Sequence, residues 1–317
     1  MSSVPGLGES HAASTVIIPA AAISRAENYA AGSIAIGLLV LAMKSAAWWL
    51  TGSAALFSDA AESVVNVVAA VVALAALRLA AKPADAEHPF GHDKAEFFSA
   101  VVEGSLIVGA ALVILQHAWQ VYQAPQPIAQ PALGMALNGV SALVNMGWAM
   151  LLMRRGRSLR SPALRADGRH LLADVVTSVG VIIGVALVVT TGLQLLDPLF
   201  AALTALYVLG SGAFVIRDSV GGLMDAAPAA DIVERIRALV GEHANGAIEA
   251  HDLRTRHGGR HTFLEFHLVV PGSMTVSDAH AICDRVEEAL RAEMDGLMIT
   301  IHVEPDGSAK HRGVIVL

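Results

Sequence analysis

Long apolar runs separated by short polar segments fill the first 220 residues. Runs of about twenty residues, enough to cross a hydrocarbon core of about 30 Å, recur near 31–50, 54–79, 97–122, 133–153, 168–191 and 199–216. From about residue 221 the hydropathy falls to that of a globular domain. The pattern therefore predicts a membrane α-helical bundle of six transmembrane helices over 29–220, followed by a separate domain over 221–306.

Basic residues are distributed unevenly over the predicted loops. The loops between the second and third spans and between the fourth and fifth carry Arg78, Lys82, Lys94, Arg154, Arg155, Arg157, Arg160, Arg165 and Arg169. The loops near 51–53, 123–132 and 192–198 contain no Lys or Arg. Because basic loops stay on the cytosolic side, we expect both the N-terminus and the C-terminus to be cytosolic.

The second domain alternates helical and extended patterns. The predicted order is a helix over 230–243, strands over 248–255 and 261–270, a helix over 276–294 and a strand over 297–303. This order is typical of a small α+β sandwich of the ferredoxin-like kind. The ends of the chain, 1–28 and 307–317, are predicted to form a mobile N-terminal arm and a loose tail.

Composition supports a membrane class and narrows the chemistry. The chain is 55% hydrophobic and 15% charged, far from a soluble average. A net charge of -7 gives no basic surface for a nucleic-acid partner. The single cysteine, Cys283, excludes a disulfide framework and a Cys-rich zinc module. The thirteen histidines are then the available nitrogen ligands.

Polar residues form one face on each of two predicted spans. Asp59, Glu62 and Asn66 follow helical spacing on the second span, and His170 and Asp174 are four residues apart on the fifth. Ionisable side chains in lipid are costly, so they indicate function by default. Interhelical hydrogen bonding is the alternative reading. For Asp59 both a structural role and a place on an outward path remain open.

These two faces predict a transport site if they meet. Glu62, Asn66, His170 and Asp174 would then supply one imidazole nitrogen and three oxygens, a set that suits Zn²⁺ and also Fe²⁺, Mn²⁺ or Co²⁺. The two carboxylates carry the charge that one divalent ion neutralises. Because protons compete for the same atoms, we expect metal/proton antiport by alternating access.

Two further groups of ligand-type residues lie outside the spans. Asp85, His88 and His92 fall within the 82–96 loop, which Pro89 and Gly91 bend. In the second domain the candidates are His251, His257, His261, His267, His280, His302 and Glu304. His251, His267 and His302 lie on three predicted strands and could approach one another across a sheet. Solvated surface histidines are the alternative for both groups.

These motifs together resemble the cation diffusion facilitator family over residues 30–306. The similarity rests on the run Gly-Ser-Ala-Ala-Leu-Phe-Ser-Asp59, the loop 82–96, the His170-x-x-x-Asp174 pair and the strand His251-Asp-Leu-Arg-Thr-Arg256. Members of that family are homodimeric efflux transporters for zinc, iron, manganese, cobalt or cadmium, usually in exchange for protons. The resemblance thus implies a homodimer, most simply in a bacterial inner membrane.

The resemblance also implies roles for individual residues. The implied sites are a transport site (Glu62, Asn66, His170, Asp174), a loop site (Asp85, His88, His92), a binuclear cytosolic site (His251, His267, His280, His302, Glu304) and a helix-locking ion pair (Lys94, Asp225). Zinc-transporting relatives usually carry Asp or His followed four residues later by Asp, where this chain has Glu62 and Asn66. The choice of metal therefore stays open, with zinc as the first expectation.

Two other classes of function compete with transport. A membrane-anchored metal sensor or buffer would need only one span and no intramembrane ligands. A metalloenzyme would need a motif such as His-Glu-x-x-His or a nucleophile motif, and the sequence contains neither. Six spans with a buried ligand set therefore favour a transporter that is not an enzyme.

Overall fold

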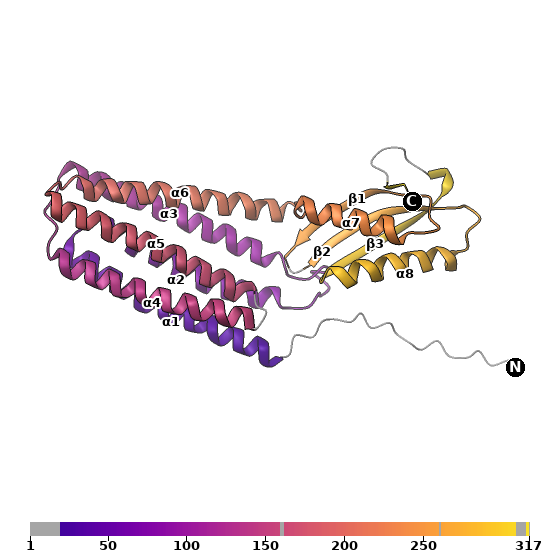
Figure 1. Ribbon diagram of the computed structural model, residues 1–317, viewed down its shortest axis with the longest axis horizontal. Helices are drawn as coiled ribbons and strands as arrows, with labels where there is room; N and C mark the ends of the chain where they lie inside the picture. The colour runs from indigo at the N-terminus through magenta and orange to yellow at the C-terminus, as the bar shows by residue number, and fades with distance from the viewer. Residues whose placement is uncertain (1–19, 159–161, 260, 309–314, 317) are drawn as a thin grey trace.

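Six long helices lie side by side in an elongated bundle, with a small α/β domain at one end (Figure 1). The computed structural model describes residues 20–158, 162–259, 261–308 and 315–316. The bundle helices are α1 (Ala20–Thr51), α2 (Ala54–Ala80), α3 (Ala95–Gln123), α4 (Pro131–Ser158), α5 (Pro162–Thr191) and α6 (Leu196–Leu223). Each contains a segment long and apolar enough to cross a membrane, which confirms the predicted six-helix bundle.

Two helices begin earlier than the apolar runs indicated. Helix α1 starts at Ala20, so residues 20–28 of the predicted arm are helical. Hydropathy misses this extension because its Ala-rich sequence favours a helix without being apolar throughout. Helix α5 starts at Pro162, a residue well suited to a first helical turn. Residues 1–19 and Arg160 lie outside the described residues.

Small residues let the bundle helices pack closely. At the crossing of α3 and α6, a Cβ added to Gly104 would lie 3.0 Å from the carbonyl oxygen of Gly212. Such contacts between small residues drive helix association in lipid, where burial of apolar surface gives little gain. Large apolar side chains such as Trp119, Tyr207 and Phe214 instead point outward and are exposed. This distribution fits a lipid-facing surface.

The N-terminus of α2 is held by a buried carboxylate from the start of α6. The Oδ1 of Asp197 accepts a hydrogen bond from Ser53 Oγ at 2.5 Å, and its Oδ2 accepts one from the Ala54 amide at 2.6 Å. The Ala55 amide donates to Oδ1 at 3.2 Å. Asp197 thereby satisfies free amides of the first helical turn and places negative charge at the positive end of the helix dipole.

The α/β domain has two layers. Its elements are α7 (Ala230–His243), β1 (Glu249–Gly258), β2 (His261–Val270), α8 (Val276–Glu293) and β3 (Leu297–Pro305). The sheet order is β3-β2-β1-β4, where β4 is the short strand Ile315–Val316, with β1 antiparallel and β3 parallel to β2. Both helices share one buried core with Leu264, Phe266 and Leu268 of β2. The predicted ferredoxin-like α+β domain is confirmed.

The end of the chain is more ordered than a loose tail. After the short 3₁₀ helix η1 (Asp306–Ser308), strand β4 (Ile315–Val316) pairs with Glu249 and Ala250 of β1. The predicted loose tail over 307–317 therefore includes an edge strand at β4, formed by an apolar pair too short to register in a hydropathy pattern. Residues 309–314 and 317 lie outside the described residues.

Strand register sets three histidines in a row. His251 of β1 is paired with His267 of β2, which is paired with His302 of β3. Side chains alternate between the two faces of a strand, and Phe266 and Leu268 face the helices. The three imidazoles consequently lie on the face of the sheet opposite α7 and α8.

Candidate metal sites

Asn66 joins the polar faces of α2 and α5. Its Nδ2 donates a hydrogen bond to Asp174 Oδ2 at 2.6 Å, and its Oδ1 lies 3.2 Å from His170 Nε2. Asp174 is buried and His170 is exposed. Helices α2 and α5 therefore face each other, and three of the four predicted ligands, Asn66, His170 and Asp174, are in contact.

Glu62 is the fourth predicted ligand of this cluster. One of its two carboxylate oxygens, Oε2, is buried and has no hydrogen-bond partner among the described residues. The Glu62 carboxylate is close enough to Asp174 and Asp59 to interact electrostatically. Among the described residues only two groups of three or more His, Cys, Asp or Glu have ligand atoms mutually within 4.8 Å, and the Glu62, His170 and Asp174 set is not one of them. The four residues share a neighbourhood, and an ion would have to draw them closer.

The early start of α5 explains the depth of His170. Hydropathy placed this residue at the very end of its span, whereas α5 begins at Pro162, roughly two turns before it. His170 is thus inside a helix and exposed. Helix α5 begins at the end of the bundle nearest the α/β domain (Figure 1).

The loop between α2 and α3 holds a compact ligand group. Ligand atoms of Asp85, His88 and His92 lie within 4.8 Å of one another, and the two imidazole rings are 4.4 Å apart. Backbone amides of His88 and Glu87 donate to Asp85 Oδ1 and lower the pKa of its carboxyl. His92 Nδ1 is buried and unpartnered among the described residues. A preformed carboxylate with two imidazoles suits a divalent transition metal.

The row of imidazoles on the sheet converges with Glu304. His267 Nδ1 lies 2.9 Å from Glu304 Oε1, and His251 Nε2 lies 3.5 Å from Glu304 Oε2. His302 Nε2 is 3.7 Å from the same carboxylate. Yet His251 Nε2, His267 Nδ1 and Glu304 Oε2 are all buried without a hydrogen-bond partner in the described chain. Such orphaned atoms around one point fit a metal ion.

One predicted ligand of this site lies elsewhere. His280 on α8 is exposed, and its imidazole lies 3.6 Å from Asp284 of the same helix. Because α8 packs on the opposite face of the sheet from the three histidines, a single chain does not bring His280 to them.

Two acidic neighbours of His251 are not among the residues predicted from the sequence. Glu249 Oε1 lies 3.0 Å from His251 Nδ1, and Asp252 has a ligand atom within 4.8 Å of those of His251 and His267. Glu249 precedes His251 by two positions, so strand alternation could have indicated it. Asp252 follows His251 directly and reaches the same side only because β1 is irregular between His251 and Arg254, where Asp252 has φ 50°.

The predicted ion pair joins the bundle to the α/β domain. Lys94 Nζ is 3.0 Å from Asp225 Oδ1, and Arg256 of β1 is 3.4 Å from the same oxygen. The hydrogen bond from Lys94 lowers the pKa of Asp225. All three side chains are partly exposed, so the pairing contributes modestly to stability.

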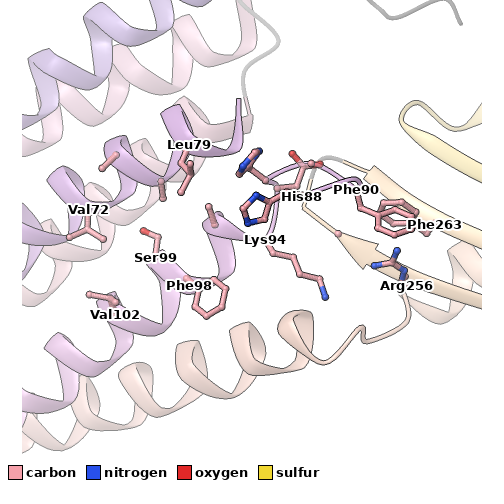
Figure 2. A pocket seen from close by; sticks show the side chains of 17 residues that line it. Val72, Leu79, His88, Phe90, Lys94, Phe98, Ser99, Val102, Arg256 and Phe263 are labelled. Carbon is pink, nitrogen blue, oxygen red and sulfur yellow. The ribbon is translucent and has the colours of Figure 1, made fainter. Parts of the chain in front are cut away.

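The tip of the β1–β2 hairpin contacts the loop that carries the Asp85 group. His261 pairs with Asp93, which directly follows His92. Figure 2 shows Arg256 beside Phe263 and Phe90 of the loop, with its guanidinium 3.9 Å from the centre of the Phe263 ring. Phe90, His92, Asp93, Arg256 and Phe263 line a cavity of about 670 Å³ between the ends of α2 and α3 and the hairpin. The loop that carries the Asp85 group is therefore in direct contact with the α/β domain that carries the histidine row.

Comparisons with known proteins agree with the division of the chain into a helical bundle and an α/β domain. The family model described as the cation efflux transmembrane domain matches residues 31–224, and that of the cation efflux protein cytoplasmic domain matches residues 228–306. The uncharacterized transporter sll1263 of Synechocystis sp. is 42% identical over 280 residues, which cover 88% of this chain and 90% of that protein.

A second relative and one solved structure are also similar. The cation-efflux pump FieF of Yersinia pestis is 32% identical over 276 residues, which cover 87% of this chain and 91% of that protein. The structure of CzrB in its Zn form is 50% identical and covers 27% of this chain and 97% of that one, with a TM-score of 0.26. The two family models span the bundle and the α/β domain. This chain, an integral membrane protein with an α/β domain after its six helices, belongs to the cation diffusion facilitator family.

Proposed function

We propose that the protein exports a divalent transition metal from the cytosol in exchange for protons, by alternating access. Zinc is the first candidate, and iron, manganese, cobalt and cadmium are the alternatives. Membership of a cation efflux family and the similarity to a cation-efflux pump support metal transport. We further propose a bacterial inner membrane with both termini cytosolic, in line with the basic loops.

The observation that carries the proposal is the contact of Asn66 with both His170 and Asp174. It brings ligand-type side chains from α2 and α5 together inside the bundle, next to the unpartnered Glu62 oxygen. Groups that only held helices together would satisfy their own hydrogen bonds. A buried carboxylate oxygen left without a partner instead suits a site that receives a cation.

Charge balance supports exchange for protons. Glu62 and Asp174 carry two negative charges when ionised, which one divalent ion neutralises. When the ion leaves, two carboxylates remain close together in an interior of low dielectric, where protons are the available compensation. Metal and protons therefore bind at the same atoms in turn, which is the condition for antiport.

The other two groups would hold resident metal ions. We propose that Asp85, His88 and His92 bind one ion in the loop, and that His251, His267, His302 and Glu304 bind metal in the cytoplasmic domain and steady a homodimer. The ligand atoms that lack hydrogen bonds in both groups support this assignment. His280, exposed on the outer face of α8, is left as a candidate for contact with a second copy.

Reconstituted transport tests the proposal. In proteoliposomes, Asp174→Ala should abolish zinc flux, whereas Thr190→Ala on the exposed end of the same helix should leave flux unchanged. Uptake by everted vesicles should require an imposed proton gradient. A membrane-anchored sensor would bind metal in its cytoplasmic domain and show no flux even as wild type, and uptake indifferent to the gradient would remove the antiport.

A further inference from the structure

A buried ion pair lies beside the transport cluster. Lys44 of α1 and Asp59 of α2 are each 1% exposed, and Lys44 Nζ is 2.6 Å from Asp59 Oδ1. Ser178 of α5 donates to the same oxygen at 3.0 Å. Three helices thus meet at one carboxylate in the interior of the bundle, where an ionised pair is costly.

The second oxygen of Asp59 has no partner. Asp59 Oδ2 and Glu62 Oε2 are both buried without a hydrogen bond among the described residues. The two carboxylates are one turn apart on the same face of α2 and lie close enough to interact. An ion pair that only held helices together explains the contacts of Oδ1. It does not explain two neighbouring orphaned oxygens.

Asp59 lies beyond the transport cluster, farther from the cytoplasmic domain. Helix α2 runs toward that domain and α5 runs away from it (Figure 1). Asp59 therefore precedes Glu62 by one turn in the direction away from the domain, and Ser178 follows Asp174 by one turn in the same direction. An ion that leaves the Glu62 and Asp174 carboxylates on the side opposite the domain meets Asp59 next.

We propose that Asp59 Oδ2, Glu62 Oε2 and the Ser178 hydroxyl form a second position for the transported divalent cation, at which the Lys44 ammonium competes with it. This inference rests on the proposed transport function. The position offers only oxygen ligands, whereas the transport cluster includes an imidazole. A borderline ion such as Zn²⁺ prefers sites with nitrogen, so the second position binds more weakly and serves release.

Charge arithmetic gives Lys44 its part. Three ionised carboxylates, Asp59, Glu62 and Asp174, balance one lysine and one divalent ion. With Lys44 present a single ion neutralises the group, and a second ion is repelled. When no divalent ion is bound at the second position, the Lys44 ammonium thus neutralises Asp59 there.

Counting bound Zn²⁺ tests the proposal without depending on transport. The background is the full chain with the other groups removed by His88→Ala, His92→Ala, His251→Ala and His267→Ala. Here the chain with Lys44 should bind one Zn²⁺ per protomer in equilibrium dialysis, Lys44→Met should bind two, and Lys44→Met/Asp59→Asn should return to one. Unchanged stoichiometry in Lys44→Met would overturn the second position.

Flux measurements on the otherwise native chain separate an ion position from a structural pair. Lys44→Met/Asp59→Asn removes both charges, and we expect zinc affinity at the transport cluster within about threefold of wild type but flux reduced about tenfold or more. Ser141→Ala, a buried serine on α4 whose hydroxyl bonds within its own helix, should retain most flux. Full flux in the double variant refutes the second cation position. Absence of flux in the wild-type chain refutes the proposed transport function. In that case the number of bound Zn²⁺ ions still tests the second position.

Discussion

Asn66 and Asp174 are joined across α2 and α5 by a hydrogen bond of 2.6 Å between the amide Nδ2 and the carboxylate Oδ2. An amide donor toward a carboxylate costs less than two facing carboxylates. The side chain at position 66 therefore allows the two helices to approach when no ion is bound. It also supplies a neutral oxygen where zinc-type relatives are expected to have a charged one.

We predict that Asn66→Asp shifts metal preference toward zinc. The added carboxylate removes the donor to Asp174 and adds negative charge to the ligand set, which favours Zn²⁺ binding by about tenfold. Flux across a panel of Zn²⁺, Fe²⁺, Mn²⁺, Co²⁺ and Cd²⁺ measures the shift. Ser63→Ala is the control, because the Ser63 hydroxyl bonds only to its own helix. An unchanged order of preference would remove Asn66 as a determinant of selectivity.

Glu249 should strengthen metal binding in the cytoplasmic domain. Its contact with His251 Nδ1 leaves Nε2 free to face Glu304, as in other sites where a carboxylate orients a metal-binding histidine. We expect Glu249→Ala to weaken Zn²⁺ binding there by about 10–100-fold. Calorimetry measures this Zn²⁺ affinity in a chain that also carries Asp174→Ala and His88→Ala. The control is Glu265→Ala, a substitution at an exposed position of β2. Equal affinities would mean that Glu249 does not position the ligand.

The contribution of Asp225 to stability should vanish in acid. Lys94 lowers the pKa of Asp225, so the pair stabilises the folded state above the ordinary carboxyl pKa of about 3.9. The contribution falls as the pH drops through the lowered pKa. Since both side chains are partly exposed, Asp225→Asn should cost only about 0.5 kcal/mol.

Thermal unfolding of the detergent-solubilised chain checks this window. Asp225→Asn should lower Tm by about 1–2 °C at pH 6 and have a smaller effect near pH 3, below the ordinary carboxyl pKa of about 3.9. The exposed Asp295→Asn should have no effect at either pH. A Tm difference for Asp225→Asn that is no smaller at pH 3 than at pH 6 contradicts an origin in the ionised pair.

Gly259 should be required for the contact between the hairpin and the loop. It has φ +82°, and an added Cβ would lie 3.0 Å from the Asp93 backbone oxygen. Gly259→Ala therefore combines backbone strain of about 1–3 kcal/mol with a collision that separates His261 from Asp93. We expect amide exchange of residues 256–259 to rise about tenfold or more.

Gly192 provides a matched control for this experiment. It has φ +74° and nothing within 4 Å of an added Cβ. Gly192→Ala should therefore add similar backbone strain and leave exchange in the hairpin unchanged. Equal exchange in both variants would show that the hairpin does not depend on the close approach to Asp93.

Patterns of hydrophobicity and spacing predicted the architecture and most of the residues that meet. The six spans, helix α7 and strand β2 follow from periodicity, because burial in lipid or in a core selects apolar side chains at regular positions. The contact of α2 with α5 could be proposed only because both faces carry ionisable groups with no other explanation in lipid.

What could not be predicted depends on rotation, register and local irregularity. To predict that Asp59 pairs with Lys44, one would have to know that Lys44 lies on the side of α1 that faces α2. Asp252 reaches the histidines through a distorted strand, and a one-residue change in register would send it to the other face. The separation of His280 depends on which face of the sheet α8 covers, which helical periodicity alone does not determine.

The capping of α2 by Asp197 has a mechanical consequence. Ser53, Ala54 and Ala55 all donate hydrogen bonds to Asp197 at the start of α6. The N-terminal end of α2 therefore cannot move without also moving the N-terminal end of α6. Helix α6 continues at its other end toward α7 and the cytoplasmic domain (Figure 1). A tilt of α2 would thereby be transmitted through α6 to the opposite end of the bundle, along a route that does not include the α2–α3 loop.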